Sequence, residues 1–207
     1  MSEKNWERAI ELFEKLEARY PFGRYAQQAL LESAYAYYKA DEPDSAIAAV
    51  DRFTKTYPRH PSLDYAYYLR GLVNFTRGDT FMDRLLPRDP AERDAGAARQ
   101  AFFDFAELVK QFPESRYAVD AGQRMVFLRN NLAQYEMHVA DYYMRRGAYV
   151  AAANRAQQVV QSYQGTPAVP RALEIMILAY RELALNDLAA DAERVLKLNY
   201  PDRAARL

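Results

Sequence analysis

A spacing of small and large residues that recurs along the chain is the feature that most constrains its fold. A small residue is followed by large residues at +4, +7 and +11 and by proline at +12; in the second copy these are Ala46, Val50, Phe53, Tyr57 and Pro58. The copies start at Ala9, Ala46, Ala101, Ala152 and Ala189, and the fourth is weaker, with Gln164 in the proline position. Offsets of 4 and 7 place residues on one face of a helix, and proline ends that helix. The chain is therefore predicted to repeat one helical element.

A second helix precedes each of several copies. Twelve residues before the small residue stands another small or apolar residue, with a tyrosine three positions later; the pairs are Ala34 with Tyr37, Ala140 with Tyr143, and Ile177 with Tyr180. A pair of helices with this spacing resembles the tetratricopeptide repeat. From Pro21 to Pro58 the spacing is 58 − 21 = 37 residues, slightly longer than the usual repeat of about 34. We expect an all-α, right-handed superhelical solenoid of about five such repeats.

Two irregularities divide the array. From Gly71 to Ala101 there are 30 residues where the spacing requires 12, so 18 are inserted, and the insertion ends in a helix-start signal from Asp89 to Glu92. We predict N-terminal repeats over residues 1–112, with an inserted loop at about 77–90, and C-terminal repeats over 113–207 that continue the first half. Between Pro113 and Ala140 there are 14 extra residues, close to four helical turns. This predicts one long helix, or two nearly continuous ones, across about 115–145.

Composition excludes several classes of function. The 28 basic and 28 acidic residues balance, which argues against an electrostatic nucleic-acid binder, and the absence of cysteine excludes disulfides and thiolate sites. The two histidines, His60 and His138, are far apart and suggest no metal site. We therefore expect no catalytic residue, no cofactor and no metal. The remaining enzymatic hypothesis places a site in the inserted loop, around Asp83, Arg84 and Asp89.

Aromatic residues mark a first candidate binding surface. The first helix of each tetratricopeptide pair lines the concave side, and five of its eight inward positions in repeats two and three carry an aromatic residue. The predicted peptide-binding residues are Gln28, Tyr35, Tyr38, Tyr65, Tyr68 and Phe75. Tyrosine offers a large apolar body, few rotamers and one polar group, which suits recognition of an extended peptide. The alternative is that these rings simply pack between helices.

A second candidate surface consists of Tyr142, Arg145, Arg146 and Arg155. Arg155 interrupts an alanine-rich helix and is suited to pair with a partner's carboxylate, because arginine can bind a carboxylate with two hydrogen bonds. That hypothesis requires Arg155 to be exposed. Arg145 and Arg146 end the predicted long helix, where cations also suit the helix dipole without any partner.

A series of short motifs resembles the outer membrane assembly factor family BamD. In chain order the motifs are Tyr20 to Gln28, Tyr35 to Lys39, Asp51 to Phe53, His60-Pro61, Asp64-Tyr65, Arg70 to Leu72, Arg88 to Pro90, Val126 to Leu128, Tyr142-Tyr143 and Arg146-Gly147. The resemblance as a whole extends from about Asn5 to Tyr200. No single motif is unique to the family, but the ordered series is specific.

The resemblance implies a non-catalytic lipoprotein of tetratricopeptide repeats on the periplasmic face of the outer membrane. It implies docking of a BamA periplasmic POTRA domain on the C-terminal repeats, with Arg155, Tyr142 and Arg146 in that region. It also implies other lipoprotein partners such as BamC, and N-terminal repeats that receive the aromatic-ended C-terminal signal of unfolded outer-membrane proteins. No nucleic acid is implied as a partner.

Two departures from the family pattern bear on these expectations. The lipidated N-terminal cysteine is absent. The chain begins almost directly with the residue spacing that marks the second helix of a repeat. We interpret this as trimming of an N-terminal lipid anchor and of the first helix. The loop from Asp83 to Pro90 differs from the family's tighter version. The alternative function is another periplasmic tetratricopeptide adaptor, serving envelope or peptidoglycan machinery.

Overall fold

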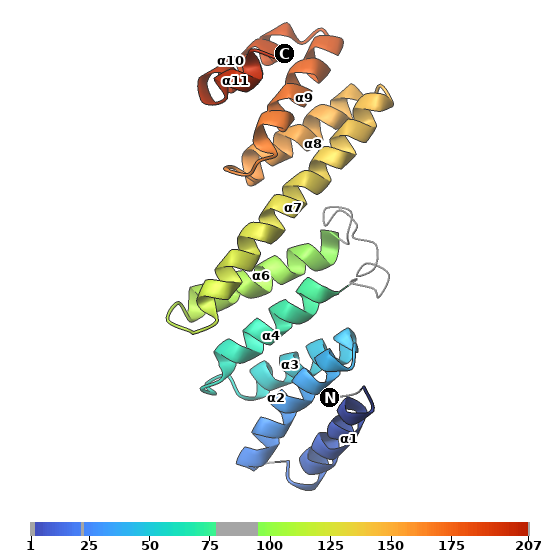
Figure 1. Ribbon diagram of the computed structural model, residues 1–207, viewed down its shortest axis with the longest axis vertical. Helices are drawn as coiled ribbons and strands as arrows, with labels where there is room; N and C mark the ends of the chain where they lie inside the picture. Colours follow the sequence, from blue (N-terminus) through green and yellow to red (C-terminus); the bar gives the residue numbers. More distant parts are fainter. Residues whose placement is uncertain (1–2, 22, 78–94, 207) are drawn as a thin grey trace. The chain divides into compact units, whose positions relative to one another are not determined.

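The computed structural model describes residues 3–21, 23–77 and 95–206, and this part of the chain contains helices and no strands. The helices in chain order are α1 (Glu3–Arg19), α2 (Arg24–Lys39), α3 (Pro43–Thr56), α4 (Leu63–Thr76), α6 (Ala95–Gln111), α7 (Ala118–Arg145), α8 (Tyr149–Ser162), α9 (Val169–Glu182), α10 (Asn186–Asn199) and α11 (Pro201–Ala204) (Figure 1). Consecutive helices pack against each other from α1 to α4 and from α8 to α11. The predicted all-α, solenoid-type array of tetratricopeptide-like helix pairs is confirmed.

The chain separates into two compact units. Of the described residues, the first unit comprises 3–21, 23–77 and 96–126, and the second comprises residue 95 and residues 127–206. The division after residue 126 falls within α7, so the division at residue 113 stays a prediction. The long helix predicted across about 115–145 is confirmed, because α7 is continuous from Ala118 to Arg145. The inserted loop at about 77–90, the helix start from Asp89 to Glu92, and Asp83 and Arg84 lie outside the described residues.

The recurring spacing supplies the core of both units. In the first unit, Ala46, Val50 and Phe53 of α3 are fully buried, as are Ala101, Phe105 and Leu108 of α6. In the second unit the equivalent fully buried residues are Ala152, Ala156 and Val159 of α8, with Leu196 of α10. The small or apolar residues at the equivalent positions of the preceding helices, Ala34, Ala140 and Ile177, are fully buried as well. The periodic positions are thus the faces along which neighbouring helices pack.

The turn within a helix pair repeats the same hydrogen bond. The carbonyls of Tyr37, Tyr143 and Tyr180 each accept the backbone N–H five residues later, at 2.9, 3.0 and 2.9 Å. The residue before each donor has a positive φ, 61° at Asp41, 70° at Gly147 and 56° at Ala184. This is the Schellman closure of a helix C-terminus. The tyrosine that marks the first helix in the sequence therefore also marks where that helix ends.

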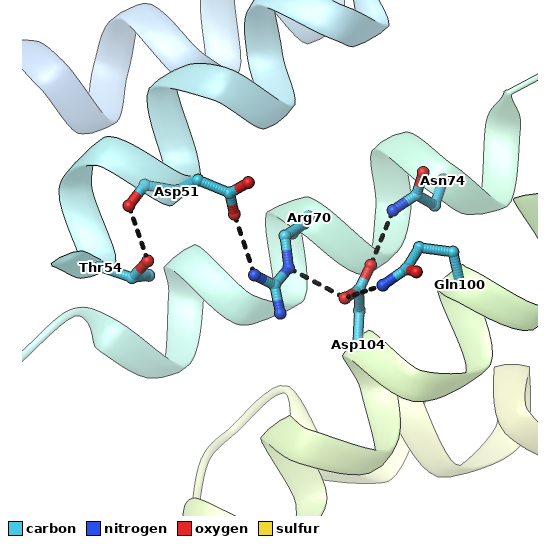
Figure 2. Close-up of polar contacts among 6 residues, drawn as sticks. All are labelled: Asp51, Thr54, Arg70, Asn74, Gln100 and Asp104. Carbon is cyan, nitrogen blue, oxygen red and sulfur yellow. Dashed lines mark hydrogen bonds and ion pairs between the residues drawn. The ribbon is translucent and has the colours of Figure 1, made fainter.

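A polar cluster lies inside the first unit and joins α3, α4 and α6 (Figure 2). The Asp104 carboxylate on α6 is 1% exposed and accepts hydrogen bonds from Asn74 Nδ2 at 2.7 Å and Gln100 Nε2 at 3.2 Å. Arg70 Nε lies 2.9 Å from Asp104 Oδ1, and Arg70 Nη1 donates to Asp51 Oδ1 at 2.9 Å. A buried carboxylate is tolerated only when such partners compensate for its lost hydration. The cluster therefore fixes the position of α4 against α3 and α6. This helix carries three of the predicted peptide-binding residues.

Candidate functional site: a tyrosine row and a docking surface

Five of the predicted peptide-binding residues form a row of aromatic rings on α2 and α4 of the first unit. On α2, Tyr35 contacts Trp6 of α1 edge-on, with ring centres 5.7 Å apart, and lies 6.3 Å from Tyr38. On α4, Tyr68 and Phe75 both contact the buried ring of Phe105, at 6.1 and 6.3 Å. We call Tyr35, Tyr38, Tyr65, Tyr68, Phe75 and Tyr117 the tyrosine row.

Tyr117, in the turn before α7, completes the row and was missed by the sequence analysis. Its ring stacks on Tyr68 at 4.7 Å with an interplanar angle of 17°, and its centre lies 5.6 Å from that of Tyr65. The repeat spacing does not assign Tyr117 to an inward position, because the 14 extra residues interrupt the spacing there. The available signal was local, since an aromatic residue directly precedes the long helix.

A pair of charged residues closes the α7 end of the row. Asp120 Oδ2 accepts the Tyr68 hydroxyl and Arg124 Nε, both at 2.6 Å, and the Arg124 guanidinium lies 4.8 Å from the centre of the Phe75 ring. Burial acts to raise the pKa of Asp120, but the hydrogen bonds from Arg124 and Tyr68 outweigh it and lower that pKa. The spacing of four residues between Asp120 and Arg124 was visible in the sequence as a helix-surface pair.

Burial changes the pKa of two tyrosines of the row. Burial raises the pKa of Tyr65 well above its ordinary value, and burial together with the hydrogen bond to Asp120 raises that of Tyr68. Each row residue is half-buried rather than buried. The rings thus pack between helices and still present part of their surface to solvent, so the two sequence hypotheses for them are compatible. Gln28 is exposed on α2 and takes no part in the ring contacts.

The second candidate surface lies at the C-terminal end of α7 and on α8. Tyr142, Arg145 and Arg146 are exposed, and their spacing of three and four residues places them on neighbouring turns. Tyr142 is 51% exposed and contacts the Tyr143 ring edge-on at 5.8 Å. We call Tyr142, Arg145, Arg146 and Arg155 the docking surface.

Arg155 has a partner within its own unit. Its Nη1 donates to Glu136 Oε2 of α7 at 3.0 Å, and the side chain is 41% exposed while that of Glu136 is fully buried. The hydrogen bond to Glu136 raises the pKa of Arg155. The exposure that the docking hypothesis requires is therefore present, but the guanidinium also neutralises a buried carboxylate. Glu136 was missed by the sequence analysis, although an acidic residue beside the apolar Met137 was a signal.

The two surfaces consist of aromatic and arginine side chains. Within residues 3–21, 23–77 and 95–206, no three histidine or acidic side chains gather in a way that could hold a metal ion. In the same ranges, no helix combines the length and the apolar character needed to span a bilayer. The aromatic rings and guanidinium groups of the two surfaces are suited to binding polypeptide.

Comparison with known proteins gives a consistent result. The chain matches the family model YfiO, described as outer membrane lipoprotein, over residues 1–196. It is 52% identical over 201 residues to the outer membrane protein assembly factor BamD of Neisseria meningitidis serogroup B, covering 97% of this chain and 75% of the relative. It is 44% identical to BamD of Xylella fastidiosa, covering 98% of this chain and 69% of the relative. It is 41% identical to BamD of Vibrio cholerae, covering 94% of this chain and 80% of the relative.

Proposed function

The chain belongs to the YfiO family of outer membrane lipoproteins, and from this premise we propose that it serves as a non-catalytic scaffold in the assembly of outer membrane proteins. The observation that carries the proposal is the match to BamD assembly factors over nearly the whole chain, at 52% identity in Neisseria meningitidis. The proposed place of action is the periplasmic face of the outer membrane.

The finer proposal assigns one task to each surface. The docking surface binds a BamA periplasmic POTRA domain, and the tyrosine row receives the aromatic C-terminal signal of an unfolded outer membrane protein. Partly exposed rings held by Phe105 and Trp6 need little ordering when a peptide binds, which favours affinity. Other lipoproteins of the same machinery, such as BamC, are further proposed partners.

Docking can be tested by binding of this chain to the POTRA domains of its own organism's BamA. Charge reversal at Arg155 is a poor test, because it would place a second carboxylate against the buried Glu136 and destabilise the fold. Tyr142→Ala is cleaner, since the side chain is half-exposed and anchors of this kind contribute about 2 kcal/mol or more. Tyr20→Ala, which removes an exposed tyrosine in the first unit, is the control.

We expect the wild type to bind, Tyr142→Ala to bind about 30-fold more weakly, and Tyr20→Ala to bind normally. Equal loss in both variants would contradict this docking surface. No binding by the wild type would contradict the BamA assignment and favour a different periplasmic adaptor function.

Peptide reception can be tested separately with a peptide that ends in an aromatic residue. The peptide is taken from the C-terminus of an outer membrane protein of the same organism, and its final residue is changed to alanine in the comparison peptide. Tyr68→Ala removes the ring stacked on Tyr117 and should weaken binding of the aromatic peptide about tenfold. Equal binding of both peptides would contradict the proposal.

A further inference from the structure

Helix α10 carries apolar side chains on two sides. One side packs within the second unit, where Ala192 and Leu196 are buried. The other side faces solvent, with Leu188 47%, Val195 41% and Leu198 81% exposed. The tyrosine row and the docking surface were defined on other parts of the chain, so neither proposed task accounts for this second apolar side.

The three exposed side chains lie along one side of the helix. Leu188 precedes Val195 by seven residues and Leu198 by ten, close to two and three helical turns. Along the axis, Leu188 and Leu198 are about 15 Å apart at 1.5 Å per residue. Exposed apolar side chains that gather on one face between charged residues mark a surface for another chain. We call this surface the α10 face; its residues are Leu188, Asp191, Arg194, Val195 and Leu198.

The charged residues of α10 are segregated along the helix. Asp187 and Asp191 lie in its N-terminal half, and Arg194 and Lys197 lie in its C-terminal half. Asp191 Oδ1 and Arg194 Nη2 form an ion pair at 2.9 Å, with side chains 63% and 77% exposed. Both can therefore contact a second chain without leaving a buried charge unpaired. Lys197 is already paired with Glu193 of the same helix.

The α10 face is complementary to a second copy of itself. When two α10 helices lie antiparallel and are centred at the level of Glu193, Leu188 of each copy is level with Leu198 of the other. The same arrangement brings Asp191 of each copy within one residue of the level of Arg194 of the other. A parallel pair would instead place like charges at the same level. An interface with two-fold symmetry requires such a self-complementary patch.

We propose that two copies of this chain associate through an antiparallel pair of α10 helices. Leu188 and Leu198 form the two apolar contacts, and Asp191 with Arg194 forms the polar contacts between them. One helix from each copy makes a small interface, so the dimer is weak, with a dissociation constant on the order of 10–100 µM. The symmetric pattern of charge is the reason for choosing a second copy over a partner of different sequence.

Sedimentation equilibrium of the whole chain, from about 5 to 500 µM, tests the proposal. We expect a reversible equilibrium between monomer and dimer in the wild type. Leu198→Glu places a carboxylate in each apolar contact and should raise the dissociation constant about tenfold or more. Leu12→Glu changes an exposed leucine of α1 in the first unit, and as the matched control it should leave the dissociation constant unchanged.

An exchange of charges tests the antiparallel arrangement. Asp191→Arg places an arginine beside Arg194 of the other copy and should raise the dissociation constant about fivefold. The double variant with Asp191→Arg and Arg194→Asp again has opposite charges across the interface, so its dissociation constant should return to the wild-type value. The double variant also keeps an oppositely charged pair within its own helix, which preserves the isolated fold.

A wild type that stays monomeric at about 500 µM would overturn the proposal, and this result needs no variant. Equal dimer formation by Leu198→Glu and Leu12→Glu would overturn it, as would failure of the charge exchange to restore association. A monomeric wild type whose binding to the POTRA domains is lost in Leu198→Glu would overturn it as well, because the α10 face would then belong to that partner.

Discussion

At the residue scale, Gly71 shows how closely α4 and α6 pack. A Cβ atom at Gly71 would lie 2.5 Å from the ring of Phe105, which is fully buried and cannot withdraw. Gly71→Ala should therefore destabilise the protein by about 1–3 kcal/mol through overpacking. The measurement is the urea midpoint of unfolding followed by circular dichroism.

Gly122 provides the matched control for this substitution. It lies within α7, and a Cβ there would meet no atom within 4 Å. Gly122→Ala should stabilise the protein by up to about 1 kcal/mol, because alanine favours the helix. A loss of stability in Gly122→Ala as large as that in Gly71→Ala would refute the steric explanation.

The buried Asp104 is expected to contribute strongly to stability. Asp104→Asn keeps the shape of the side chain but leaves Arg70 without its buried counter-charge (Figure 2). We expect a loss of about 3 kcal/mol in the free energy of unfolding, the low end for breaking a buried ion pair, because Arg70 retains Asp51. The exposed pair of Asp44 with Arg77 is the control, and Asp44→Asn should cost less than about 1 kcal/mol. Similar losses from both substitutions would contradict a special role for Asp104.

At the element scale, the end of α8 departs from the recurring spacing, because Gln164 stands where the other copies have proline. Tyr163 has φ −121° and ψ 38°, similar to Tyr57 and Tyr200, each of which is followed by proline. Gln164→Pro would keep the carbonyl that accepts Arg129 Nη2 at 2.5 Å. We expect a gain of about 0.4–1 kcal/mol from reduced freedom of the unfolded chain.

The measurement is the thermal unfolding of Gln164→Pro, compared with that of the wild type and of a control variant, Asn130→Pro. The second variant places proline inside α7, where it removes a helical hydrogen bond and should cost about 3 kcal/mol or more. Destabilisation by Gln164→Pro would mean that the turn after α8 differs from the turns after α3 and α10.

The short helix α11 is held to α9 by a carboxylate with two partners. Glu174 of α9 accepts Arg203 Nε of α11 at 2.7 Å and Arg171 Nη1 at 3.2 Å. Burial acts to raise the pKa of Glu174, but the hydrogen bonds from Arg203 and Arg171 outweigh it and lower that pKa. A carboxyl with a lowered pKa stabilises the folded state above its ordinary pKa, and this contribution disappears as the pH falls through the folded value.

Glu174→Gln should therefore cost roughly 2 kcal/mol at pH 7. The difference from the wild type should shrink as the pH falls below about 4, the ordinary pKa of glutamate. Unfolding midpoints measured between pH 7 and pH 3 test this expectation. Asp202→Asn changes an exposed residue of α11 and is the control. A constant difference across that range would contradict the role of the Glu174 charge.

At the scale of the whole molecule, the two proposed surfaces lie in different units. Tyr68 belongs to the first unit and Tyr142 to the second. Substitutions at sites without shared partners usually have additive effects. We expect Tyr68→Ala to weaken binding of the aromatic peptide without changing binding of the POTRA domains, and Tyr142→Ala to do the reverse.

The free energies of binding of both ligands are measured by isothermal titration calorimetry for Tyr68→Ala, for Tyr142→Ala and for the double variant. Free energies of binding that add within about 0.5 kcal/mol would support independent surfaces. A larger interaction energy would indicate that binding of one ligand alters the surface for the other.

Much of the array was predictable from local spacing. Residues at offsets of 4 and 7 share a helix face whatever surrounds them, so Ala46, Val50 and Phe53 could be assigned to the core without a structure. The helical character of the segment that forms α7 followed in the same way, because 14 residues preserve the helical phase, and the structure shows it to be one continuous helix. The positions of the tyrosine row on α2 and α4 also followed from the spacing, whereas their function stays a proposal.

The contacts that give the surfaces their character were not predictable. Glu136 with Arg155, Asp104 with Arg70, and Tyr117 with Tyr68 join residues 19, 34 and 49 positions apart in the chain. Many acidic side chains stand at comparable positions, and only packing selects which of them is buried beside an arginine. The pairing of Glu17 with Arg52 likewise depends on how α1 and α3 are placed in the fold.

The sequence by itself determined the helices, their buried faces and the family, because these depend on residue types at short and regular intervals. Tertiary structure alone decided which charges are shared within the fold and which remain available to a partner. The physical reason is that hydrogen bonding and dielectric environment are set by neighbours in space. For Arg155 and Glu17, those neighbours come from other helices.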